Sequence, residues 1–236
     1  MRLILITFLF TFLFSVILKS QDSTYIAPKL TKAIIVSSTL MTAGIITNEK
    51  GIKQDFQEWV RNQYNVSQSS IDDYLQHLPI AMLYTADLLK GTDKREVGRH
   101  TRHLITSEIF SIGTALLLKE LVNNTRPNGG SHSFPSGHTA HAFTGATVFY
   151  LSMREEHPIL AYAGFIPASL TGAYRMIKDK HWVSDVLFGA GLGILSATLV
   201  YELDVWKSRT KTRESKGDFS FQLGFTPAGL GVTLNW

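Results

Sequence analysis

The sequence predicts an all-α fold, a bundle of about six helices that ends in a short C-terminal β-hairpin. Two observations carry this prediction. Apolar residues recur at helical spacing through the middle of the chain, and three uncharged runs there have fifteen, seventeen and sixteen residues: Thr139–Met153, Pro158–Tyr174 and Val186–Tyr201. In the last eighteen residues, apolar side chains alternate with polar or small ones on both sides of a Pro-Ala-Gly turn, which is typical of two paired strands.

The expected helices follow one another with short connections. They cover Ala33–Thr47, Ser70–Leu89, Leu104–Val122, Thr139–Met153, Pro158–Ile177 and Val183–Leu203. The stretch Asn48–Gln68 is polar, and we expect it to be a surface connection. The hairpin is expected to pack its apolar face against the helices.

The N-terminus has the composition of a segment that directs a chain out of the cytoplasm. Met1-Arg2 precedes Leu3–Leu18, sixteen residues without a charge, and Lys19-Ser20 follows. Sixteen residues are fewer than the ~20 that a membrane span needs, which favours a cleaved signal peptide over residues 1–20. An uncleaved N-terminal anchor is the alternative.

The remaining chain is predicted to form one helical domain over residues 21–206, followed by a basic linker and the hairpin over residues 207–236. Apolar runs of this length lie between buried core helices and thin transmembrane spans, so periodicity alone does not separate the two. Basic residues gather in Lys90–His103 and again after the last helix, an arrangement that would place both groups on one face of a membrane. This favours a membrane-embedded protein over a soluble periplasmic one.

The composition excludes several classes of protein. The chain contains no cysteine, which excludes disulfide frameworks and thiolate zinc sites. Its net charge is only +4, and the basic residues lie among acids without interleaved aromatic residues. We therefore do not expect nucleic acid as a partner.

Two short segments in the middle of the chain contain groups that bind anions. Lys119 and Arg126 are seven residues apart, about two helical turns, so both cations can point the same way. In Pro-Ser-Gly-His, Pro135 and Gly137 fix a sharp turn immediately before a helix that begins near His138. The free backbone N–H groups at such a helix start bind anions readily.

A third segment adds the groups for nucleophilic chemistry. Arg175 lies at the end of one helix, and His181 and Asp185 are four residues apart at the start of the next. That spacing puts the carboxylate beside one ring nitrogen and leaves the other nitrogen free to attack. Cations and backbone donors around it would stabilise the charge on a phosphoryl group.

The segment Ser131–His141 contains three histidines, which raises the possibility of a metal site. The chain offers no second ligand cluster with zinc spacing, and the nearby cations would repel a metal ion, so we predict no metal and no cofactor. His132 is expected in a loop, and His141 one turn inside a helix. Asp72, Asp73 and His77 are explained as an exposed helix start.

The order Lys-x6-Arg-Pro, Pro-Ser-Gly-His and Arg-x5-His-x3-Asp resembles the type 2 phosphatidic acid phosphatase (PAP2) superfamily over about Leu104–Leu203. That superfamily has a helical core and includes lipid phosphatases, acid phosphatases and vanadium haloperoxidases. The resemblance implies that His181 is a nucleophile that forms a phosphohistidine, Asp185 orients it, and His138 is the general acid. It also implies a phosphate cradle made of Lys119, Arg126, Ser136, Gly137 and Arg175.

Two features depart from the family pattern. Tyr174 stands where the family usually has serine, and only seven residues, Asn128–Phe134, separate the first two motifs, which suggests little lid over the site. The resemblance and the apolar helices together imply a metal-independent phosphatase of the cell envelope, in the inner membrane with a periplasm-facing site or in the periplasm. Its expected substrate is a phosphorylated lipid of the phosphatidate or polyprenyl-diphosphate type, or a small phosphate ester. The alternatives are a broad-specificity periplasmic acid phosphatase, a vanadate-dependent haloperoxidase and a catalytically silent lipid-binding membrane protein.

Overall fold

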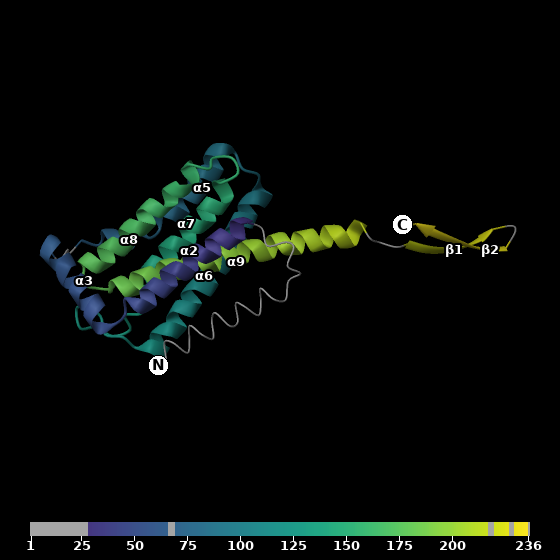
Figure 1. The fold of residues 1–236 in the computed structure, drawn as a ribbon. Coiled ribbons are helices and arrows are strands. Elements are labelled where there is room, and N and C mark those ends of the chain that lie inside the picture. The colour runs from purple at the N-terminus through teal and green to yellow at the C-terminus, as the bar shows by residue number, and fades with distance from the viewer. Residues whose placement is uncertain (1–27, 66–68, 217–219, 227–228, 236) are drawn as a thin grey trace. The chain divides into compact units, whose positions relative to one another are not determined.

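The computed structural model describes residues 28–65, 69–216, 220–226 and 229–235, in two compact units, Met1–Val200 and Tyr201–Trp236. The predicted signal peptide or anchor over residues 1–20 lies outside the described residues. In chain order the elements are α2 (Pro28–Ile46), α3 (Lys50–Gln63), α4 (Ile71–Leu75), α5 (Leu78–Lys90), α6 (Lys94–Val122), α7 (Gly137–Met153), the 3-10 helix η1 (Leu160–Gly164), α8 (Phe165–Ile177), α9 (Val183–Lys216), β1 (Ser220–Thr226) and β2 (Gly229–Asn235) (Figure 1).

Helix α7 lies at the centre of the first unit. It contacts α5, α6, α8 and η1, and the first half of α9 packs against it from another side (Figure 1). All the regular elements described in this unit are helices, which confirms the predicted all-α class. Apolar and polar side chains are both buried in this unit, and the polar ones include Arg175, His181 and Asp185 of the predicted site.

Glycines let α9 approach its neighbours closely. A Cβ atom at Gly193 would lie 2.5 Å from the carbonyl oxygen of Ala140 in α7, and one at Gly191 would lie 2.6 Å from that of Ser37 in α2. Each contact involves backbone atoms, which do not move aside as a flexible side chain does. Backbones packed this closely hold α7 and α9 in one arrangement.

The loop before α7 is anchored in this core. Phe134 is 1% exposed, and its ring centroid lies 4.7 Å from that of Phe188 in α9. The cluster around the two rings includes Met41, Ala115, Leu118, Leu192 and Leu195. Burial of Phe134 therefore fixes the three residues that follow it, Pro135, Ser136 and Gly137, at the start of α7.

The structure corrects three predicted elements. The expected helix Ser70–Leu89 is broken into α4 and α5, because Pro79 in the first turn of α5 has no N–H to continue the helix across the break. The expected helix Pro158–Ile177 begins only at Phe165, after η1. The expected start of the third helix at Leu104 is late, since Asp93 caps α6 by accepting a hydrogen bond from the N–H of Arg95.

The polar stretch Asn48–Gln68 is not a plain surface connection, because most of it forms α3. The amide of Gln57 donates hydrogen bonds to Asp179 Oδ1 at 2.6 Å and to the carbonyl oxygen of Met176 at 2.9 Å. Arg61 Nε donates to the same aspartate at 3.0 Å. Polar residues of α3 thus stabilise the connection between α8 and α9. The sequence does not indicate this pairing, because the two segments lie more than a hundred residues apart.

Among the described helices, one segment is long and apolar enough to cross a membrane, Val183–Leu203 in α9. It is mostly buried within the unit, so length and composition alone do not distinguish a span from a core helix.

The second unit contains the end of α9 and two antiparallel strands. The predicted basic linker after residue 206 continues as helix to Lys216. Strands β1 and β2 pair in register from Ser220 with Asn235 to Thr226 with Gly229. The predicted packing of this hairpin on the helices stays a prediction.

The close contact at Gly193 predicts a sharp effect on stability. Gly193→Val should lower the free energy of unfolding by about 1–3 kcal/mol or more, because its side chain meets the backbone of α7. The matched control is Gly113→Ala in α6, where an added Cβ meets nothing within 4 Å. That variant should be as stable as the parent or slightly more stable, since alanine favours a helix by about 1 kcal/mol over glycine. Thermal unfolding followed by circular dichroism measures both, and equal stability of the two variants would contradict the packing described here.

Candidate active site

The predicted site residues come together where four helix ends meet. Lys119 lies in the last turn of α6 and Arg175 in the last turn of α8. The starts of α7 and α9 supply the others, apart from Arg126, which lies in the loop after α6. The ends of α6 and α8 bring cations, and the start of α7 brings backbone N–H groups, so the arrangement suits an anion.

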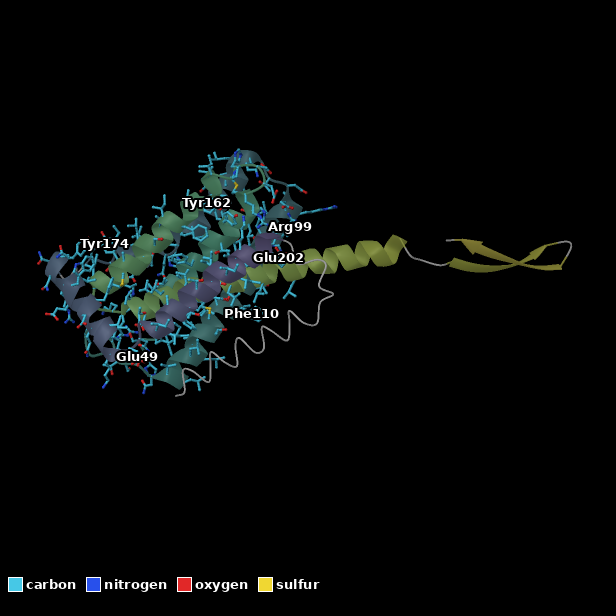
Figure 2. The ribbon with its side chains drawn as sticks, in the orientation of Figure 1. Glu49, Arg99, Phe110, Tyr162, Tyr174 and Glu202 are labelled. Atoms are coloured by element: carbon cyan, nitrogen blue, oxygen red, sulfur yellow. The ribbon has the colours of Figure 1, made fainter. Side chains whose placement is uncertain are left out.

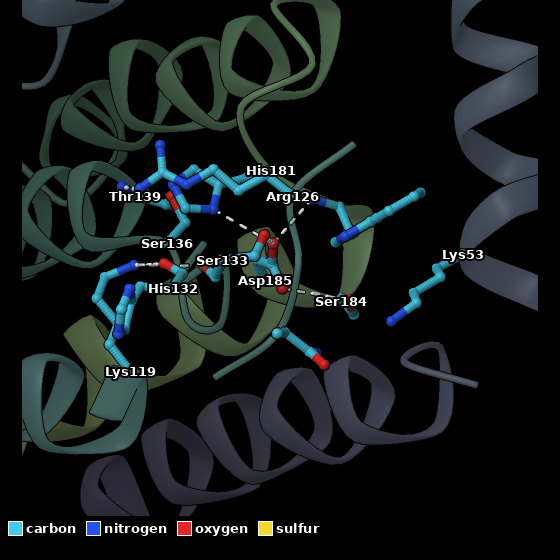
Figure 3. A network of polar contacts seen from close by, with 12 residues as sticks. Lys53, Lys119, Arg126, His132, Ser133, Ser136, Thr139, His181, Ser184 and Asp185 are labelled. Carbon is cyan, nitrogen blue, oxygen red and sulfur yellow. Dashed lines mark hydrogen bonds and ion pairs between the residues drawn. The ribbon is translucent and has the colours of Figure 1, made fainter. Parts of the chain in front are cut away.

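Asp185 is the centre of the polar network in Figure 3. It is fully buried and accepts hydrogen bonds from the backbone N–H of Trp182 at 2.9 Å and from the hydroxyl of Ser133. The Nδ1 atom of His181 lies 3.2 Å from Asp185 Oδ2 and donates to the carboxylate. The backbone carbonyl of Asp185 in turn accepts from the N–H of Ser136 at 3.0 Å, which ties the start of α7 to α9.

These contacts determine the chemical state of His181. Because Nδ1 carries the hydrogen of the hydrogen bond to Asp185, Nε2 of the neutral ring has a free electron pair. The ring is only 2% exposed, and this burial lowers its pKa to about 4 although the carboxylate opposes the change. His181 is therefore neutral at neutral pH, the form that can attack an electrophile.

Two cations are held by the loop that follows α6. Lys119 Nζ donates to the carbonyl oxygens of His132 at 2.8 Å and Ser133 at 3.3 Å. Arg126 Nε donates to the carbonyl oxygen of Ser131 at 3.0 Å. Burial, with repulsion from Arg126, lowers the pKa of Lys119 to about 8. The seven-residue loop is thus long enough to wrap both cations and orient them.

The start of α7 is rigid and open. Ser136 is the N-cap residue: its buried hydroxyl accepts from the N–H of Thr139 and lies 2.9 Å from the hydroxyl of that residue. At Gly137 an added Cβ would meet nothing within 4 Å, so the space beside this first residue of the helix is open. An anion can approach the helix start there.

Arg175 is buried and forms an ion pair with Asp72 of α4. Its Nη1 atom donates to Asp72 Oδ2 at 2.8 Å, and Lys178 donates to the other oxygen at 2.7 Å. Burial alone would raise the pKa of Asp72, but these hydrogen bonds outweigh it and hold the pKa below its ordinary value. The interpretation of Asp72 as part of an exposed helix start is therefore wrong, since the residue is 0% exposed. Arg175 Nε is buried with no hydrogen-bond partner among the described residues, and such a donor suits an anionic ligand.

The three histidines of Ser131–His141 face different partners. His138 Nε2 lies 3.0 Å from Asp73 Oδ1, whereas His141 lies between Glu108 and His77, at 3.0 and 2.9 Å. His132 is in the loop, 2.9 Å from the hydroxyl of Ser131. Within the part of the chain that the structure describes, no group of three or more histidines and acids could hold a metal ion.

Sequence reasoning missed several residues of this site. Ser133 and the N–H of Trp182 complete the hydrogen bonds of Asp185, and α4 brings Asp72 and Asp73. Ser133 and Trp182 adjoin predicted residues in the chain, and that proximity was an available signal. The two aspartates lie far from the motifs in sequence, and only the fold brings them to Arg175 and His138.

Part of this chain is similar in sequence to known proteins. Residues 123–209 match the sequence model of the PAP2 superfamily. A lipid A 1-phosphatase from Porphyromonas gingivalis is 45% identical over 93 residues, which are 39% of this chain and 20% of that protein. The chain thus matches about a fifth of the length of this curated relative.

Two crystal structures are similar at a lower level. Aquifex aeolicus LpxE is 25% identical, with a TM-score of 0.46, and the match covers 61% of this chain and 93% of that one. A transmembrane PAP2 type phosphatidylglycerolphosphate phosphatase from Bacillus subtilis is 19% identical, with a TM-score of 0.45 and coverage of 76% and 98%. The segment that matches the PAP2 superfamily model, residues 123–209, contains every predicted site residue except Lys119.

Proposed function

We propose that the protein is a metal-independent phosphatase that hydrolyses phosphomonoester or diphosphate groups of lipids through a phosphohistidine intermediate. The observation that carries the proposal is the state of His181. A neutral imidazole, oriented by Asp185 and with Nε2 free, lies among Lys119, Arg126 and Arg175. Buried cations around an uncharged nucleophile favour an anionic substrate over a neutral one.

In the first step, the electron pair of His181 Nε2 attacks phosphorus, and the bond from phosphorus to the leaving oxygen breaks. His138 gives its proton to that oxygen, so the product leaves as an alcohol, or as a phosphomonoester when the substrate is a diphosphate. The imidazole gains positive charge as the nitrogen–phosphorus bond forms, and Asp185 stabilises that charge.

In the second step, water attacks phosphorus and gives a proton to His138, and the nitrogen–phosphorus bond breaks. Inorganic phosphate leaves, and both histidines return to their starting states. Through both steps Lys119, Arg126, Arg175 and the N–H groups at Gly137 stabilise charge on the phosphoryl oxygens. The orphaned Arg175 Nε would find its acceptor there.

The proposal of a lipid substrate rests on the surface of the helical unit and on the similarity of residues 123–209 to the PAP2 superfamily. Phe110 of α6 and Tyr162 of η1 lie on its outside, more than half exposed (Figure 2). They belong to larger exposed apolar sets on α6 and around α8: Ile105, Ile109, Leu116, Leu117, Leu121, Ile159, Leu160, Ile166 and Leu170. Apolar side chains exposed in such number suit contact with a membrane. We therefore propose that the protein lies in the cell envelope, and the periplasm-facing site stays a prediction from the sequence.

The nucleophile can be tested by trapping. His181→Ala should abolish turnover, because the attacking nitrogen is lost, while thermal unfolding should show a folded protein. Brief incubation of the parent with 32P-labelled substrate, in the presence of a chelator, should yield protein-bound label that is stable in base and labile in acid, as expected for a phosphoramidate. Turnover by the variant would refute the assignment of His181. Label that disappears in the chelator and returns with zinc or magnesium would refute the metal-independent mechanism.

The lipid preference predicts a difference between substrates. In detergent micelles, kcat/KM for a phosphorylated lipid should exceed that for a soluble alkyl phosphate by about tenfold or more, because the acyl chains add binding energy away from the reacting group. Cell fractionation should place the activity with the membranes. Equal kcat/KM values and activity in the soluble periplasmic fraction would favour a broad-specificity acid phosphatase.

The role of His138 predicts a dependence on the leaving group. An alkoxide leaves poorly without a proton, whereas a nitrophenolate leaves readily. His138→Ala should therefore reduce kcat/KM on alkyl phosphates by ~10²–10⁴-fold and affect nitrophenyl phosphate much less. The measurement is the slope of log kcat/KM against leaving-group pKa, which should steepen in the variant. An unchanged slope would mean that His138 only binds phosphate.

A further inference from the structure

We propose that Asp73 is the positioning residue of the general acid. Its carboxylate holds the ring of His138 with Nδ1 toward the leaving oxygen and stabilises the protonated ring that acid catalysis requires. This inference rests on the proposed function, in which His138 protonates the leaving group. Asp73 lies in α4, outside the segment 123–209 that matches the PAP2 superfamily.

The contact between the two residues determines which ring nitrogen is available. His138 Nε2 lies 3.0 Å from Asp73 Oδ1, so the Nε2–H group donates to the carboxylate. Only Nδ1 then remains to give a proton to a leaving group. A ring held at one nitrogen has a fixed orientation, and the geometry is the same kind of histidine–carboxylate pair that His181 makes with Asp185.

The position of Asp73 is fixed by its neighbour in α4. Asp72 is fully buried and forms ion pairs with Arg175 and Lys178 of the α8 end, at 2.8 and 2.7 Å. Helix α4 also packs against α8 along its length. A five-residue helix has little stability of its own, so these ion pairs hold it in place. Because the helix is held in place, the backbone of Asp73 is already fixed, and little conformational entropy is lost when its carboxylate pairs with His138.

The carboxylate of Asp73 opposes two effects that favour the neutral form of His138. Burial lowers the pKa of His138, and the positive charge of Arg175 in α8 lowers it further. Asp73 and Asp72 of α4 act in the opposite direction. The next histidine on α7, His141, is engaged by Glu108 of α6 and by His77. An imidazolium beside an arginine loses its proton easily, so removal of the nearest carboxylate should leave fewer enzyme molecules with a protonated acid.

The test is Asp73→Asn, with Asp73→Ala as a second variant. Because the Asp73 side chain is 49% exposed, both should fold, and thermal unfolding checks this. On alkyl phosphates kcat/KM should fall by about tenfold or more, with little change on nitrophenyl phosphate. The alkaline limb of the kcat/KM profile on alkyl phosphates should move to lower pH, since the acid loses its proton earlier. Asp55→Asn on the exposed face of α3 is the matched control for loss of one negative charge, and it should leave both substrates unaffected.

A double-mutant cycle separates this role from an effect through Arg175, which lies 4.0 Å from Asp73. In the His138→Ala background, Asp73→Asn should cause no further loss on alkyl phosphates. Equal losses on both substrates, or a full loss that persists without His138, would overturn the inference and assign Asp73 to the phosphate cradle. If His138→Ala steepens the leaving-group dependence and Asp73→Asn does not, this inference alone fails. If neither variant changes it, the proposed role of His138 fails first.

Discussion

The rest of the site depends on the hydrogen bonds that end at Asp185. Its carboxylate accepts from a loop hydroxyl, from a backbone N–H and from His181, and its own carbonyl accepts from the backbone of Ser136. One buried residue thereby fixes the nucleophile, the loop before α7 and the start of α7 relative to one another. A buried carboxylate without these donors would be costly, so each partner also stabilises the fold.

A second constraint is the gathering of like charges. Lys119, Arg126 and Arg175 repel one another, and each is also desolvated or buried. The structure offsets this repulsion by different means: backbone carbonyls accept from Lys119 and Arg126, whereas the buried Asp72 neutralises Arg175. Unlike a carboxylate, a carbonyl oxygen carries no full charge, so it orients a cation without cancelling the attraction for a phosphoryl group. Lys119 and Arg126 are therefore oriented by neutral acceptors, whereas Arg175 is oriented by a carboxylate.

Much of this was predictable from the sequence, and the remainder has physical reasons. The helical class and the core helices followed from long apolar runs. The seven-residue spacing of Lys119 and Arg126 predicts two helical turns, but α6 ends at Val122, and the loop after it positions Arg126 instead. Helix α3 was missed because its polar residues are satisfied by Asp179, more than a hundred positions away. Asp72 was misjudged for the same reason, since an aspartate at a helix start is ordinarily solvated and nothing local indicates that Arg175 and Lys178 bury it. Local patterns predict elements, but long-range ion pairs appear only once the elements are packed.

The site draws its two histidine–carboxylate pairs from different parts of the chain. His181 and Asp185 lie together on one short segment, whereas His138 meets a carboxylate that α4 brings from 65 residues earlier. Under the proposed mechanism, a change in the first hundred residues would alter how the departing group is protonated and leave the pair of His181 and Asp185 intact. The two pairs would then control separate properties that natural variation can change independently. His181 and Asp185 would govern the uptake of a phosphoryl group, and His138 and Asp73 the choice of the alcohol from which it is taken.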